Sequence, residues 1–171
     1  MATTPASTAT PTKEFQPAFE GVQQSNDFDD AFACIAMIAG KTLDEVRQTA
    51  IDKFKHPRHG PFWIADTLIT NLLAHYGWVA TIYKENTGGI ASLPELAIGM
   101  VEYNPVTEIG RHVLFHRMSA AGNPRQATEY IIDPAYWIEP DKHFRTDIKG
   151  FPIAWYIGVH KMKKIAAKGS Q

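Results

Sequence analysis

The chain has 171 residues, of which 44% are hydrophobic and 11% aromatic, a composition typical of one globular domain with a sizeable core. Its formal net charge is -1, and because basic and acidic residues are interspersed, we expect neither nucleic acid nor a membrane as a partner. A single cysteine excludes an internal disulfide. No stretch approaches the roughly 18 apolar residues that a membrane span needs.

The composition predicts one domain with a tail at each end. Residues 1–17 begin with MATTPASTATPTK, which lacks the basic start and the apolar run of a secretory signal, so we predict a disordered tail. We assign the folded domain to residues 18–162 and a solvated C-terminal tail to residues 163–171. The absence of a signal favours the cytoplasm, and secretion by a non-classical route stays open.

Three helices are predicted in the first half of the chain. The apolar run that follows Asp29 and Asp30 ends at Gly40, which is typical of a buried helix with an acidic N-terminus and a glycine C-cap. Residues 42–55 begin with a threonine and a glutamate at capping-box spacing and continue as an amphipathic helix. Residues 62–77 have apolar side chains at three-to-four spacing and end at a glycine.

The second half of the chain consists of short β-branched or aromatic segments separated by Gly, Pro and Asn. We predict strands at 78–83, 96–103, 111–118, 128–132 and 153–159. A block of helices followed by a block of strands predicts an α+β fold, with an antiparallel sheet packed on the helices.

Gln24 stands six residues before Asp30, and small or apolar residues follow at Ala31, Ala33 and Met37. This spacing resembles the nucleophile helix of the papain-like cysteine peptidases, in particular their bacteriocin-leader-processing (double-glycine) branch, with the pattern Q-x5-C-[GA]-x-A-x-x-x-M. Where the family has its cysteine, this chain has Asp30. A thiol at that place is activated by the N-terminal field of the helix, whereas an aspartate there is stabilised by the same field.

Two later motifs resemble the same family. GRHVLF, which contains His112, resembles the family's G-x-H strand, and YIIDP, which contains Asp133, resembles its strand that ends in D-P. The resemblance implies a papain-like fold in which Gln24 is the oxyanion donor, His112 the imidazole and Asp133 the carboxylate that orients the ring. Asp30 would then occupy the nucleophile position and face the imidazole.

Each candidate also has a purely structural reading. Asp30 can be a helix cap, a histidine in an amphipathic strand is commonly a packed residue, and Asp-Pro commonly ends a strand at a turn. Cys34 lies in the middle of the apolar run, where a small buried hydrophobe is expected rather than a nucleophile. The histidines come from unrelated segments without the spacing of metal ligands, so we predict neither a metal nor another cofactor.

Chemistry limits what Asp30 can do. A carboxylate that attacked an amide would have to form an anhydride while it expelled an amine, which is uphill, so the acyl-enzyme route of a thiolate is closed. We therefore predict a papain-like peptidase-fold protein that is inactive as written and binds a peptide or protein partner in its cleft. Two alternatives stay open: a nucleophile-substituted form of an active cysteine peptidase or amidase, and a structural or interaction domain without a functional cleft.

Overall fold

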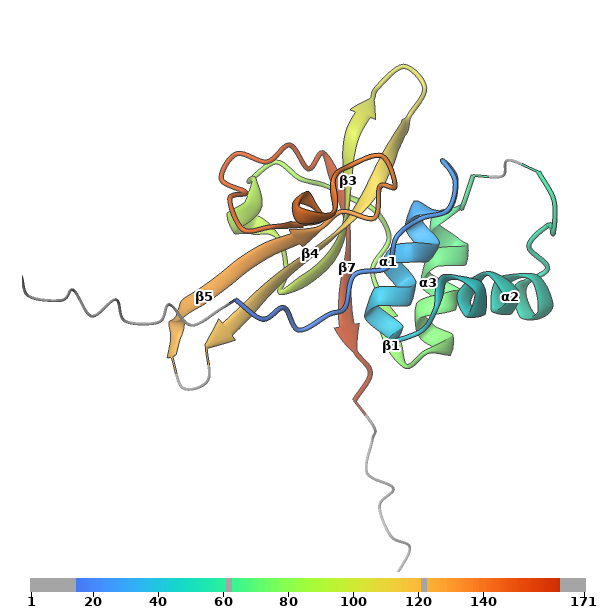
Figure 1. Cartoon of the computed structure of the whole chain (residues 1–171), viewed down its shortest axis with the longest axis horizontal. Helices are drawn as coiled ribbons and strands as arrows, with labels where there is room; N and C mark the ends of the chain where they lie inside the picture. The colour runs from blue at the N-terminus through green and yellow to red at the C-terminus, as the bar shows by residue number, and fades with distance from the viewer. Residues whose placement is uncertain (1–14, 61–62, 121–122, 164–171) are drawn as a thin grey trace, which may run out of the picture.

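The computed structural model describes residues 15–60, 63–120 and 123–163. In these ranges three helices come first and a seven-stranded antiparallel sheet follows. Figure 1 shows the three helices standing together beside the sheet, while the long hairpin of the fourth and fifth strands extends away from them. The predicted α+β class is confirmed.

The helices are α1 (Asp30–Ala39), α2 (Leu43–Phe54) and α3 (Asp66–His75). Residues 30 to 38 are all buried, so α1 is the central helix of the molecule. It ends at Gly40, whose φ of 64° is the left-handed conformation that glycine adopts without strain. Helix α2 begins with the predicted capping box, in which Thr42 and the glutamate three residues later bond each other's backbone amides.

The third helix begins later than predicted. The expected start at Phe62 lies outside the described residues, and Trp63 to Ala65 are not helical. Ala65 is extended, with φ of -66° and ψ of 150°, and Asp66 supplies the acidic first turn. Trp63 packs edge-on against Phe28 at a centroid distance of 5.2 Å. The predicted helix was therefore too long, because its apolar spacing counted Trp63, whose side chain packs from a segment before the helix.

The strands are β1 (Trp78–Ala80), β2 (Lys84–Glu85), β3 (Leu96–Asn104), β4 (Ile109–Ala120), β5 (Asn123–Ile132), β6 (Phe144–Arg145) and β7 (Trp155–Lys161). Their order in the sheet is β1-β7-β3-β4-β5-β6, and β2 also pairs with β7. All five predicted strands are present. The strands β2 and β6 were not predicted, because two residues are too few to show an alternating pattern. Two short 3-10 helices lie at Ile90–Ser92 and Pro140–Lys142.

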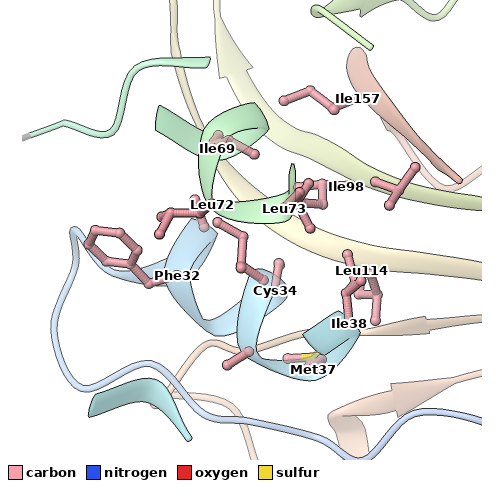
Figure 2. Packing of buried hydrophobic residues seen from close by; sticks show 14 of the residues in the cluster. Phe32, Cys34, Met37, Ile38, Ile69, Leu72, Leu73, Ile98, Leu114 and Ile157 are labelled. Carbon is pink, nitrogen blue, oxygen red and sulfur yellow. The ribbon is translucent and has the colours of Figure 1, made fainter. Parts of the chain in front are cut away.

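Both faces of the sheet are covered, and each face has its own apolar core. Ile98, Leu114 and Ile157 lie in register on the face that packs against α1 and α3 (Figure 2). Val113 and Phe115 belong to the second core, on the opposite face. Because successive residues of a strand point to opposite faces, a shift of one position along β4 changes the core that a side chain joins.

The predicted tails lie mostly outside the described residues, which leave out 1–14 and 164–171. Phe15, at the edge of the predicted N-terminal tail, contacts Tyr130 edge-on at a centroid distance of 5.1 Å. Among residues 15–60, 63–120 and 123–163, none of the helices combines the length and the apolarity needed to cross a membrane.

Candidate functional site

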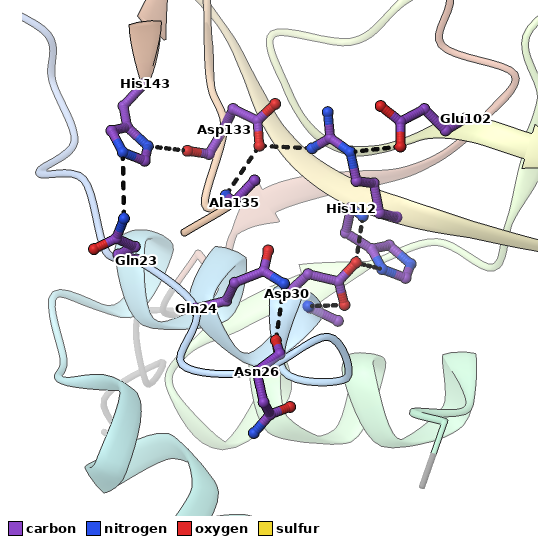
Figure 3. A network of polar contacts seen from close by, with 11 residues as sticks. Gln23, Gln24, Asn26, Asp30, Glu102, His112, Asp133, Ala135 and His143 are labelled. Atoms are coloured by element: carbon purple, nitrogen blue, oxygen red, sulfur yellow. Dashed lines mark hydrogen bonds and ion pairs between the residues drawn. The ribbon is translucent and has the colours of Figure 1, made fainter. Parts of the chain in front are cut away.

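Asp30 and His112 meet where the N-terminus of α1 faces β4 (Figure 3). The Oδ2 atom of Asp30 accepts a hydrogen bond from the backbone N–H of His112 at 2.5 Å and lies 3.0 Å from Nδ1 of the ring. Its Oδ1 atom accepts from the amide of Ala31 at 2.8 Å. The exposed fractions are 4% for Asp30 and 6% for His112, so the pair is shielded from water.

Asp30 is a carboxylate in this arrangement. Burial alone would raise its pKa, but the hydrogen bonds from His112 and Ala31 and the favourable electrostatic interaction with His112 outweigh burial and leave the pKa below its ordinary value of 3.8. A carboxylate only accepts hydrogen bonds, so Nδ1 of His112 carries a hydrogen. A carboxylate at the start of a helix is also favoured by the helix dipole.

Tyr83, which the sequence reasoning did not single out, contacts the other ring nitrogen of His112. Its hydroxyl oxygen lies 2.5 Å from Nε2, and the residue is half-buried between β1 and β2. Burial raises the pKa of the Tyr83 hydroxyl, and the negative charge of Asp30 adds to this effect. Asp30, His112 and Tyr83 therefore form one continuous chain of contacts.

Asp133 is paired with Arg111. Its Oδ1 atom lies 2.6 Å from Nη1 of Arg111 and accepts the amide of Ala135 at 3.0 Å. The Nε atom of Arg111 lies 3.0 Å from the carboxylate of Glu102, which is mostly exposed. Among the described residues, the structure brings Asp30 to His112, whereas it gives the side chain of Asp133 no hydrogen bond with His112.

The strand register explains this separation. Leu114 pairs with Ile132, so extending the β4–β5 ladder by one residue would set Asp133 opposite Val113. Val113 lies on the face away from the helices, as does Arg111 two residues before it, whereas His112 points toward α1. The carboxylate of Asp133 and the ring of His112 thus belong to opposite faces of the sheet.

Gln24 is buried, and its side-chain amide points to the chain itself. Its Nε2 atom donates to the carbonyl of Asn26 at 2.9 Å, and its backbone N–H donates to the carbonyl of Pro134 at 2.8 Å (Figure 3). Within the described part of the chain, Oε1 of Gln24 has no hydrogen-bond partner although it is buried. One of the two N–H donors of this amide is therefore bonded to Asn26, and the oxygen of the same amide is an unpaired acceptor.

Asp29, expected only as part of an acidic helix start, holds the turn that carries Gln24. Its carboxylate accepts from the backbone amides of Ser25 and Asn26 at 3.0 and 3.2 Å. It also accepts from the hydroxyl of Ser25 at 2.6 Å and from the side-chain amide of Asn26 at 3.2 Å. The turn before α1 is thus fixed by one buried acid.

Cys34 is fully buried in α1, where Figure 2 shows it among apolar side chains. Burial raises the pKa of its thiol well above 9.0, and the negative charges of Asp30 and Asp133 raise it further. His116, on the same face as His112, lies 3.0 Å from the hydroxyl of Tyr130. No group of three or more His, Cys, Asp or Glu side chains in the described ranges has the arrangement of a metal site.

Comparisons with known proteins bear on the fold. No family model matches the sequence, and a search of curated proteins gives no match. Among solved structures, the chain is similar to the peptidase domain of Streptococcus ComA, described as a bi-functional ABC transporter involved in a quorum-sensing pathway. The match has a TM-score of 0.50 at 10% sequence identity and covers 83% of this chain and 98% of that domain. The chain therefore has the papain-like α+β fold of that peptidase domain.

Proposed function

We propose that this protein is a papain-like peptidase-fold protein that binds a peptide or protein partner and does not hydrolyse amides as written. The observation that carries the proposal is the contact of Asp30 with His112 at the N-terminus of α1. In the family that the sequence resembles, the nucleophilic cysteine faces the imidazole in this way, and here the carboxylate of Asp30 stands in place of the thiol. If this carboxylate attacked an amide, the acyl intermediate would be an anhydride, which is too high in energy to form with the loss of an amine.

The groups around Asp30 support binding rather than catalysis. Gln24 uses one N–H of its side-chain amide on Asn26, and its unpaired Oε1 suits a ligand N–H. We propose Gln24, Asp30 and His112 as the remnant of the site, whereas Asp133, paired with Arg111, lies outside it.

A cavity that begins at Gln23, the neighbour of Gln24 in the chain, offers space for a side chain of the partner. Its volume is about 270 Å³, and its lining includes Gln23, Asp133, His143 and Phe144. The lining combines an aromatic ring and aliphatic groups with a few polar atoms, which is the usual make-up of a recognition pocket. The ComA domain is described as a peptidase, and a peptidase handles a peptide chain, so a peptide is the ligand class that we propose.

The binding test uses a degenerate pool of short peptides and the isotope-labelled chain. We expect the amide NMR signals of Gln23, Gln24 and His143 to shift on titration, while those of Lys53 on α2 stay in place. Mass spectrometry of the same mixture is expected to find no cleaved peptides. Cleavage would refute the inactivity, and a folded protein whose signals do not respond would favour a structural domain.

The catalytic ancestry of the site is tested with the Asp30→Cys variant. The helix N-terminus and His112 should lower the pKa of the new thiol, so alkylation near neutral pH is expected to be about tenfold faster than for an ordinary thiol. Asp66→Cys is the matched control, because Asp66 also begins a ten-residue helix and also accepts the next backbone amide, at 2.7 Å. Equal rates in the two variants would show that His112 does not activate a thiol at position 30.

The Asp30→Cys result also decides between the two main readings. A variant that labels rapidly and cleaves peptides favours the chain as a nucleophile-substituted form of a cysteine peptidase or amidase. A variant that labels rapidly without cleavage favours a binding protein, because an activated thiol without turnover means that the rest of the site does not support hydrolysis.

A further inference from the structure

We propose that Tyr83 is the positioning residue of His112, and that it takes the place on the imidazole that the family resemblance assigns to Asp133. The inference rests on the proposed assignment of Asp30 and His112 to one site. It concerns a residue that the resemblance does not include. The contact that carries it is the 2.5 Å separation between the Tyr83 hydroxyl and Nε2 of His112.

The sheet puts Tyr83 and His112 on the same side. Lys84 pairs with Tyr156 of β7, so one further step along the ladder sets Tyr83 opposite Ile157, a member of the core on the helix face. Tyr83 packs against that same core. Asp133 lies on the other face and is neutralised by Arg111 at 2.6 Å. The group within reach of Nε2 is therefore the hydroxyl of Tyr83 and not the carboxylate of Asp133.

The two contacts of the ring select one tautomer. Asp30 accepts at Nδ1, so that nitrogen carries the hydrogen. With the His112 ring neutral, as the proposal has it, the raised pKa of Tyr83 keeps its hydroxyl protonated and the hydroxyl donates to Nε2. The ring is held between an acceptor and a donor, and both its rotation and its tautomer are fixed. Removing the hydroxyl frees Nε2 without changing the packing of the aromatic ring.

The experiment is side-chain ¹⁵N NMR of the full, unsubstituted chain with labelled histidines. We expect His112 to show a protonated Nδ1 and an Nε2 resonance displaced by an accepted hydrogen bond. In Tyr83→Phe this displacement of the Nε2 resonance should be lost, while Nδ1 keeps its hydrogen because Asp30 still accepts it. A merely structural role of Tyr83 would leave the two nitrogen shifts where they are.

Two matched variants make the result specific. Tyr156→Phe removes a tyrosine hydroxyl from a neighbouring ladder position that packs on the opposite face, and Asp133→Asn removes the carboxylate named by the resemblance. Both are expected to leave the His112 nitrogen shifts unchanged. A shift of Nε2 in Asp133→Asn with none in Tyr83→Phe would overturn the proposal.

This measurement is independent of the proposed function. It reads the bond between Tyr83 and His112 in the chain that carries Asp30, whereas the Asp30→Cys labelling reads whether the site activates a thiol. If labelling is slow and the Tyr83→Phe shift is seen, the proposed ancestry fails and the positioning role stands. If labelling is rapid and the shift is absent, the positioning role fails alone.

Discussion

Replacing Asp30 by asparagine should destabilise the protein, because the carboxylate accepts hydrogen bonds that an amide cannot all accept. Oδ2 takes the backbone N–H and the ring Nδ1–H of His112, and Oδ1 takes the amide of Ala31. An asparagine has one oxygen, so in either orientation its NH₂ group faces at least one buried N–H donor. The change therefore removes charge-assisted bonds and leaves a donor unpaired.

The magnitude follows from the bonds that are lost. A hydrogen bond to a charged group contributes about 1.5–3 kcal/mol, and a buried unpaired donor costs about 1–3 kcal/mol, so we expect a loss of about 3 kcal/mol. This is a large part of a typical stability of about 5–15 kcal/mol. With a urea slope of about 2 kcal/mol per molar, the unfolding midpoint should fall by about 1.5 M. In the control Asp66→Asn the remaining oxygen can still accept the one bond from Thr67, so only the loss of the charge at a less buried helix terminus, about 0.3–1 kcal/mol, is expected.

The difference in the free energy of unfolding between Asp30→Asn and the unsubstituted chain should depend on pH. Because the folded pKa of Asp30 is lowered from 3.8, its contribution is fully present above that value and disappears as pH falls through the lower, folded value. Urea unfolding is therefore measured from neutral to strongly acidic pH, where the gap between the two proteins should narrow. A gap under about 1 kcal/mol near neutral pH, or one that persists unchanged in acid, would refute the reasoning.

Three further outcomes are expected. Arg111→Met should lower the free energy of unfolding by about 3–5 kcal/mol in urea, because it leaves the buried carboxylate of Asp133 without its cation; a loss near zero would contradict the burial of that pair. Gly110→Ala should lower the melting temperature by the equivalent of about 1–3 kcal/mol, since its Cβ would lie 2.6 Å from Cγ of Met100, and an unchanged temperature would mean that this side chain moves freely. Cys34 should react with an alkylating reagent only after unfolding, and rapid labelling of the folded chain, located by peptide mapping, would overturn its assignment as a buried hydrophobe.

The local part of the fold could be predicted from the sequence because its signals are local. Gly40 ends α1 through a left-handed backbone that glycine tolerates, and the capping box of Thr42 needs a partner only three residues away. The strands β3, β4 and β7 were recognisable because they are short β-branched or aromatic segments between Gly, Pro and Asn, and their central residues are buried on both faces. By contrast, β2 has two exposed residues and is defined by its pairing with β7 rather than by its own composition.

The candidate site was predictable only in part for the same reason. The spacing of Gln24, Asp30 and His112 carried a motif, and the structure brings the second and third of these together. The partner of Asp133 depends on the face of the sheet to which its side chain points. That face is fixed by the register of β5 on β4, which the motif itself does not contain. Tyr83 reaches His112 through the arrangement of several strands, so no pattern near position 83 signals it.

The position of β7 in the sheet limits the order in which the molecule can assemble on the ribosome. This strand, Trp155–Lys161, lies between β1 and β3 and also pairs with β2, although it follows all three in the chain. A nascent chain can close the β3–β4–β5 meander and bring α1 to β4 before β7 emerges. The segment that carries Tyr83 gains its ladder only afterwards, so the strand pairing that places its hydroxyl near the histidine forms only after β7 has been made.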